Sequence, residues 1–202
     1  KYSGTFDGSG YGIDGLTINQ SGGDRQALIR GLDASGTIKN VSLTDISVTG
    51  RDHVGTLVAY NYGLVENSSA SGAIPGTSGG GTHGGLVAVN YGTISGSYAD
   101  VDVTGNHIGG LVSVNDGGTI KNSYATGRVN GMGGAGGLVT IAYNGGLIEN
   151  SYAAGDVTGD HTVGGFIGAT ASGSAVTIRN NFSVGIATGG TANGGFIGSN
   201  DG

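Results

Sequence analysis

Two aspartates, Asp100 and Asp102, are the residues best placed for catalysis. They stand two positions apart in a strand-forming run and would share one face of that strand. Paired carboxylates hydrolyse glycosidic bonds when they converge on one groove. The following repeats place Arg128 and Asp156 at the position of Asp102 and offer no second acid beside Asp100. We therefore expect no enzyme, and a carbohydrate-active β-helix enzyme using Asp100 and Asp102 is the alternative.

The histidines are the second group with potential chemistry. His53, His83, His107 and His161 each stand shortly before a conspicuous Leu or Phe. Imidazoles stacked at one corner of a repeat structure could bind a transition metal. Their distances to that Leu or Phe differ by one residue between copies, which favours a polar corner residue copied by duplication. We expect no cofactor, and a metal site of His53, His83 and His107 is the alternative.

An internal repeat must supply the elements that position these side chains. Two series of apolar residues recur every 25 to 30 residues. The first is Ile38, Val65, Ile94, Ile120, Ile148 and Ile178, and the second is Leu57, Leu86, Leu111, Leu138, Phe166 and Phe196. One unit is too short to bury a core of its own, so the units must stack on one another.

The expected fold is an all-β, right-handed parallel β-solenoid of about six turns of roughly 27 residues. Short runs rich in Val, Ile, Thr and Tyr alternate with glycine, and no stretch keeps a helical period. The repeats occupy residues 36–202, and residues 1–35, which lack the repeat, are expected to be a lead-in or capping segment.

Composition narrows the function. The formal net charge is −6 and no basic cluster is evident along the chain, so nucleic acid is not an expected partner. No run of eighteen apolar residues is present to span a membrane. The 47 glycines come with one proline and no cysteine, which excludes a collagen helix and a disulfide framework.

Charged residues recur at fixed positions and predict the register between turns. One ladder contains Lys39, Glu66, Lys121, Glu149 and Arg179, and a second contains Asp102, Arg128 and Asp156. Opposite charges about 4.8 Å apart on adjacent strands favour this pairing, so a structural role is sufficient for both ladders. Asparagines at a neighbouring position (Asn40, Asn67, Asn122, Asn150 and Asn180, with Gly96 the exception) are expected at corners.

Aromatic residues recur in the later repeats as Tyr98, Tyr124 and Tyr152, followed by Phe182. An outward row of tyrosines could serve as a sugar-binding strip, whereas an inward row is simply core. We favour the core, with the outward strip as the alternative.

A third apolar series directly follows the Leu or Phe residues. Its members are Val58, Val87, Val112, Val139, Ile167 and Ile197. Neighbours on a strand point to opposite faces, so one of the two series should face outward. Such a stripe would be a surface for self-association or would be covered by residues 1–35. The open ends of the solenoid are a second surface for self-association.

The segments Gly164-Gly165-Phe166-Ile167-Gly168 and Gly194-Gly195-Phe196-Ile197-Gly198 resemble the GLUG motif, as does the preceding type of run at residues 120–127. GLUG repeats occur in filamentous-haemagglutinin-like adhesins and in stalks of secreted immunoglobulin-A-cleaving peptidases. Ala59, Ala88, Ser113 and Thr140 replace the last glycine of the motif in the earlier repeats.

The resemblance implies a segment of a secreted or cell-surface bacterial protein. We expect it to act as a structural stalk or adhesin without enzymatic activity, with a host or bacterial surface glycan or protein as partner. A self-assembling extracellular filament subunit is the remaining alternative.

Overall fold

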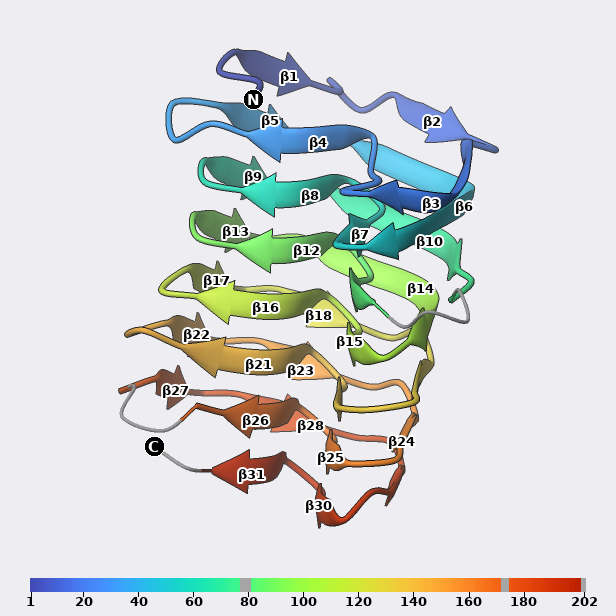
Figure 1. Cartoon of the computed structure of the whole chain (residues 1–202). Coiled ribbons are helices and arrows are strands. Elements are labelled where there is room, and N and C mark those ends of the chain that lie inside the picture. The colour runs from blue at the N-terminus through green and yellow to red at the C-terminus, as the bar shows by residue number, and fades with distance from the viewer. Residues whose placement is uncertain (77–80, 172–174, 201–202) are drawn as a thin grey trace.

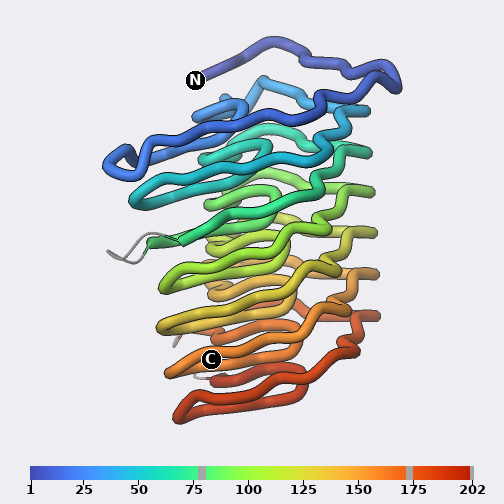
Figure 2. Tube along the Cα trace, turned by 90° about the vertical axis from the view of Figure 1, so that its right-hand side faces the viewer, coloured from blue at the N-terminus to red at the C-terminus, as the bar shows by residue number. Residues whose placement is uncertain are grey.

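The chain folds into a stack of β-strand turns in which every strand pair is parallel. The computed structural model describes residues 1–76, 81–171 and 175–200. Successive turns run from β1 at one end of the stack to β31 at the other (Figure 1), and they lie nearly parallel to one another when viewed from the side (Figure 2). The protein is therefore an all-β parallel β-solenoid, as the repeat predicted.

Two sheets of seven strands form opposite walls of the stack. We call them the opening sheet and the closing sheet, after their place in each turn. The opening sheet contains β1 (Thr5–Asp7), β5 (Thr37–Lys39), β9 (Leu64–Glu66), β13 (Thr93–Ser95), β17 (Thr119–Lys121), β22 (Leu147–Glu149) and β27 (Thr177–Arg179). The closing sheet contains β4 (Ile29–Leu32), β8 (Val58–Asn61), β12 (Val87–Asn90), β16 (Val112–Asp116), β21 (Val139–Tyr143), β26 (Ile167–Thr170) and β31 (Ile197–Asn200).

Two further sheets complete each turn. The long sheet contains β2 (Gly12–Asp14), β3 (Thr17–Asp24), β6 (Ser42–Asp52), β10 (Ser69–Ile74), β14 (Tyr98–Gly105), β18 (Tyr124–Ala125), β19 (Val129–Gly131), β23 (Tyr152–Ala153), β24 (Val157–Gly159), β28 (Phe182–Ser183) and β29 (Ala187–Gly189). The short sheet contains β7 (Val54–Gly55), β11 (Thr82–Gly84), β15 (His107–Gly109), β20 (Ala135–Gly136), β25 (Thr162–Gly164) and β30 (Ala192–Gly194).

The solenoid has about seven turns of about 29 residues, one turn more than the repeat indicated. The additional turn is residues 1–35. Phe6 pairs with Ile38, Ile13 with Leu43 and Ile29 with Val58, so this segment continues the opening, long and closing sheets. It lacks the repeated motif but has an apolar residue at these three positions, where it packs on the next turn.

Both apolar series that follow the short sheet are buried, and the expectation that one of them faces outward is wrong. Leu57, Leu86 and Leu111 and their neighbours Val58, Val87 and Val112 are all 0 % exposed, as are Val139 and Ile167. Leu57 lies at the bend between β7 and β8, so the strand alternation does not continue from Leu57 to Val58. The stripe Val58, Val87, Val112, Val139, Ile167 and Ile197 therefore belongs to the core or packs against it.

The small residue after this series lies against the short sheet, which explains the glycine of the motif. The Ser113 hydroxyl donates to the carbonyl of His107 at 2.8 Å. A Cβ on Gly168 would come within 2.8 Å of the Ala135 carbonyl oxygen. Alanine, serine and threonine occupy the same position in the earlier turns, where they are buried.

Asparagine marks the corner between the opening and long sheets, as the spacing predicted. Asn40, Asn67, Asn122, Asn150 and Asn180 have φ between 46° and 56°. Gly96, with φ of 58°, occupies the same corner in the remaining repeat. Asparagine and glycine are the residues that adopt this left-handed conformation most easily, so the corner selects them. Among the described residues, no helix has the length and apolar character needed to cross a membrane.

Candidate functional site

Aromatic rings form an outward stack on the long sheet, so the expectation that they belong to the core is wrong. The ring centroids of Tyr98 and Tyr124 are 4.7 Å apart, those of Tyr124 and Tyr152 are 4.7 Å apart, and those of Tyr152 and Phe182 are 4.9 Å apart. Tyr98 is 37 % exposed, whereas the next residue on its strand, Ala99, is 0 % exposed. The alanines point inward and the aromatic rings therefore point outward.

The geometry of this stack restricts what it can bind. The planes of adjacent rings are tilted by only 1 to 5°, so each inner ring has both faces covered by its neighbours. A sugar packs on the flat face of an aromatic ring, and Tyr124 and Tyr152 offer solvent only their edges and hydroxyls. Partial burial, together with the neighbouring tyrosines, raises the pKa of Tyr124. The strip is thus built for stacking along the solenoid axis.

The charge ladders have the predicted register. Lys39 pairs with Glu66, Lys121 with Glu149, and Glu149 with Arg179. Only the last of these pairs forms an ion pair among the described residues, with Arg179 Nη2 2.7 Å from the Glu149 carboxylate. Lys39 reaches instead to Asp7 on the preceding turn, at 3.3 Å.

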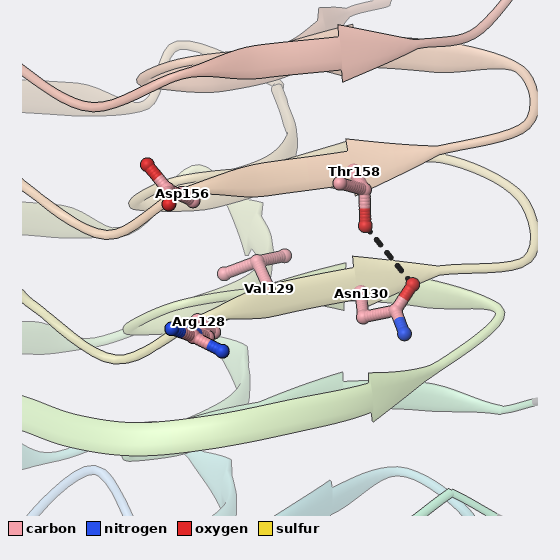
Figure 3. A pocket seen from close by; sticks show the side chains of 5 residues that line it. All are labelled: Arg128, Val129, Asn130, Asp156 and Thr158. Carbon is pink, nitrogen blue, oxygen red and sulfur yellow. Dashed lines mark hydrogen bonds between the residues drawn. The ribbon is translucent and has the colours of Figure 1, made fainter.

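Two members of the second charge ladder, Arg128 and Asp156, line a shallow groove of about 360 Å³ on the long sheet (Figure 3). Arg128 and Asp156 lie on neighbouring turns at one end of the groove, and Thr158 donates to Asn130 at 2.9 Å at the other. The Asp102 carboxylate accepts the amide N–H of Arg128 at 3.0 Å, and Asp156 accepts that of Ile186 at 3.0 Å. These aspartates therefore satisfy backbone amides of the following turn.

Asp100 and Asp102 share the exposed face of β14, as their spacing predicted. Asp100 accepts a hydrogen bond from the Thr126 hydroxyl at 2.8 Å, and Asp102 is occupied by the amide just described. Neither residue lines the groove beside Arg128. The two carboxylates thus lie along one strand rather than facing each other across a cleft.

The histidines do not form a stack. In the register of the short sheet, His83 pairs with Val54 and with Ile108, and His107 pairs with Thr82. His83 is fully buried, which lowers its pKa, and its Nδ1 lies 3.0 Å from the Thr104 carbonyl oxygen. His53 lies beside Asp52 at 2.9 Å, and His107 is exposed. Within the described residues, no group of three or more His, Cys, Asp or Glu side chains could hold a metal ion.

Two buried polar ladders were not identified from the sequence. Asn61 donates to Asn90 at 2.7 Å, and Asn90 donates to Asn115 at 2.8 Å, along the interior of the closing sheet. The other polar ladder, which we call the serine ladder, contains Ser68, Ser97, Ser123 and Ser151. Each of these serine hydroxyls accepts a hydrogen bond from a backbone N–H of the preceding turn. The recurrence of Asn-Ser at residues 67–68, 122–123 and 150–151 is the signal that could have revealed the serines.

A cationic hollow on the first two turns was also not identified from the sequence. Lys1, Arg25 and Arg30 line it together with Gly31, Tyr60 and Tyr62. The three cations come from residues 1–35, which lack the repeat, and the tyrosines come from the next turn, so no spacing along the chain connects them. The hollow is the one site described here where several charged side chains converge without following a ladder.

Comparison with known proteins supports the repeat assignment. Residues 104–130 match the GLUG motif, and this match covers one turn, because Thr104 pairs with Asn130 on the following turn. The chain is 38 % identical over 75 residues to Halomucin of Haloquadratum walsbyi, which is 37 % of this chain and 1 % of that protein. It is 36 % identical over 72 residues to the "Putative Gly-rich membrane protein" of Evansella cellulosilytica, which is 34 % of this chain and 8 % of that protein.

The chain thus matches only a small part of the length of these two relatives. No solved structure shows significant similarity to it. The chain therefore contains a GLUG motif within a parallel β-solenoid and is similar over about a third of its length to Halomucin.

Proposed function

We propose that this chain is a segment of a secreted or cell-surface protein in which the solenoid serves as a stiff, non-enzymatic stalk with an adhesive surface. The observation that carries the proposal is the continuity of the ladders. The aromatic stack and the serine ladder each run through four or more consecutive turns, and their members contact the next turn. Side chains arranged in this way stabilise an extended rod.

The relatives support the same reading. One of them is named as a membrane protein, and in both the similar segment is a small fraction of a much longer chain. Further repeats can be added to a solenoid one after another, and each added turn lengthens the rod by about 4.8 Å. Such a repeat suits a long protein that extends from a cell. The partner that the adhesive surface binds, on a host or bacterial cell, would be a glycan or a protein.

The decisive experiment exposes the purified chain to a broad panel of glycans and measures both retention and the release of reducing ends. We expect no release with any glycan, and the same result for Asp100→Asn and Asp102→Asn. Release that Asp102→Asn abolishes would make the protein a carbohydrate-active enzyme.

Self-association is the second candidate function, favoured by the apolar side chains exposed on the last turn. Phe182, Val184 and Ile186 are 53 %, 55 % and 64 % exposed. Because the Val58 series is buried, association would run through these exposed apolar side chains. Light scattering between low and high protein concentration tests it: growth of the particle that Ile186→Asp prevents would support a filament subunit, and a constant size would exclude one.

A further inference from the structure

The cationic hollow lies where the first turn meets the second. Its two adjoining parts, of about 110 and 340 Å³, share Lys1, Arg25, Arg30 and Gly31. Gly31, on β4, pairs with Tyr60 on β8, so the closing sheet forms its floor. A Cβ on Gly31 would lie 3.3 Å from Lys1 Cγ, so glycine at this position leaves the room that Lys1 occupies.

The hollow concentrates positive charge, and among the described residues the Asp24 carboxylate interacts with Arg25 electrostatically without forming an ion pair with it. Three of the eight Lys and Arg residues of a chain with net charge −6 gather here. Among the described residues, no carboxylate forms an ion pair with Lys1, Arg25 or Arg30. Asp24, next to Arg25 in sequence, is held instead by two hydrogen bonds from Arg51, at 2.8 and 2.6 Å. A cluster of unpaired cations attracts an anion from solution.

The tyrosines hold two of the cations in place. Lys1 Nζ lies 3.5 Å from the ring centroid of Tyr62, and Arg25 Cζ lies 5.0 Å from that of Tyr60. The Tyr62 ring is itself stacked on Tyr91, with centroids 4.7 Å apart. Cations placed over fixed rings lose less conformational freedom when a ligand binds, so the site is partly preorganised.

We propose that this hollow binds an acidic saccharide through its carboxylate. A guanidinium matches a carboxylate with two parallel hydrogen bonds, and Arg25 and Arg30 supply two such groups beside the Lys1 ammonium. The hydroxyls of Tyr60 and Tyr62 add donors and acceptors suited to sugar hydroxyls. The hollow is open to solvent and lined by three cations and two tyrosines, which suits a ring that carries both a carboxylate and hydroxyl groups. The site does not depend on the stalk function proposed above.

Isothermal titration with a galacturonate trisaccharide, its carboxyl-reduced neutral counterpart and inorganic sulfate tests the proposal. We expect the acidic trisaccharide to bind, the neutral one to bind at least tenfold more weakly, and added salt to weaken the acidic complex. Equal affinity for the two trisaccharides, or no binding of the acidic one, would overturn the proposal. Sulfate that binds as tightly as the trisaccharide would reduce the hollow to a simple anion site and would overturn it as well.

Variants locate the binding. Arg25→Gln and Arg30→Gln should each weaken the acidic trisaccharide at least tenfold. Arg179→Gln, which removes an exposed arginine from the seventh turn, is the matched control and should leave the affinity unchanged. Circular dichroism and thermal melting of each variant confirm that the fold is kept. Unchanged affinity in both hollow variants, or an equal loss in Arg179→Gln, would place the saccharide elsewhere and contradict the inference.

Discussion

The first turn and the later turns belong to the same sheets, but their outward side chains make different contacts. From β14 onward, the outward side chains of the long sheet repeat from turn to turn, and each binds its copy or its backbone neighbour, as Tyr124 does with Tyr98 and Asp102 with the amide of Arg128. In the first turn the outward residues do not repeat, and Lys1 and Arg25 lie over the rings of the second turn. The repeated positions thus serve stacking, and the proposed saccharide site lies where the sequence departs from the repeat.

The largest effect should come from the core of a repeated turn. Leu111 is 0 % exposed at the bend between β15 and β16. Leu111→Asp buries a charge in place of an apolar side chain and should cost more than about 5 kcal/mol, which would unfold the chain. Circular dichroism and urea unfolding measure it. Leu111→Met is the control and should cost less than about 1.5 kcal/mol; a folded Leu111→Asp protein would contradict the assigned core.

The buried asparagine ladder should give the next largest effect. Asn90→Ala removes the acceptor of Asn61 and the donor to Asn115, and all three side chains are 0 % exposed. The Asn115 side-chain carbonyl oxygen loses its donor, and the Asn61 amide keeps only its longer bond to the Thr93 carbonyl at 3.3 Å, so the free energy of unfolding should fall by about 2 to 4 kcal/mol. The comparison is Asn180→Gly at an exposed corner with φ of 56°, where glycine fits and the loss should stay below about 1 kcal/mol. Equal losses in urea unfolding would mean that the interior ladder contributes nothing of its own.

Acid should loosen the first turn before the others. Hydrogen bonds from Asn40 and from the Ser9 amide, with the nearby Lys39, lower the pKa of Asp7 from 3.8 to about 2. Hydrogen bonds from Arg51 likewise lower the pKa of Asp24. A carboxylate with a lowered pKa in the folded state stabilises the fold above pH 4, and this contribution is lost as the pH falls from about 4 to about 2.

Hydrogen exchange measures this difference between the turns. Between pH 4 and pH 2, after correction for the intrinsic exchange rate, amides around Asp7 should lose protection while those near Ile120 keep theirs. Asp7→Asn should remove the pH dependence contributed by that residue. Uniform loss of protection along the solenoid would show that the first turn is no more acid-sensitive than the rest.

How far the sequence predicts the molecule depends on whether a feature follows the repeat. The pairs Lys39–Glu66 and Lys121–Glu149 were predictable because spacing alone fixes the register of stacked turns. The orientation of Tyr124 was not, because its strand neighbour Ala125 is also apolar and the alternation can be read in either phase. Leu57 and Val58 are both buried because the chain bends between β7 and β8, and no residue type in the sequence predicts that bend.

The cationic hollow marks the limit of such reasoning. Lys1, Arg25 and Arg30 are separated along the chain and meet only because one solenoid turn brings them beside Tyr60 and Tyr62. None of the three cations lies at a position that recurs in the repeats. The repeat period, which predicts the scaffold, therefore does not predict this site. Residues 1–35 were interpreted as a lead-in because they lack the repeated motif, whereas their strands pair with the next turn in three of the sheets.

The smallest expected effect comes from an exposed member of a repeated ladder. Lys121 pairs in register with Glu149, but the Glu149 carboxylate is bound by Arg179 at 2.7 Å. Lys121→Ala should therefore change the free energy of unfolding by less than about 0.5 kcal/mol, whereas Arg179→Ala should cost up to about 1 kcal/mol. Thermal melting at low and high salt compares them, because salt should narrow the difference by screening the ion pair. A loss from Lys121→Ala as large as that from Leu111→Asp would show that outward and inward positions have been interchanged and that the register itself is wrong.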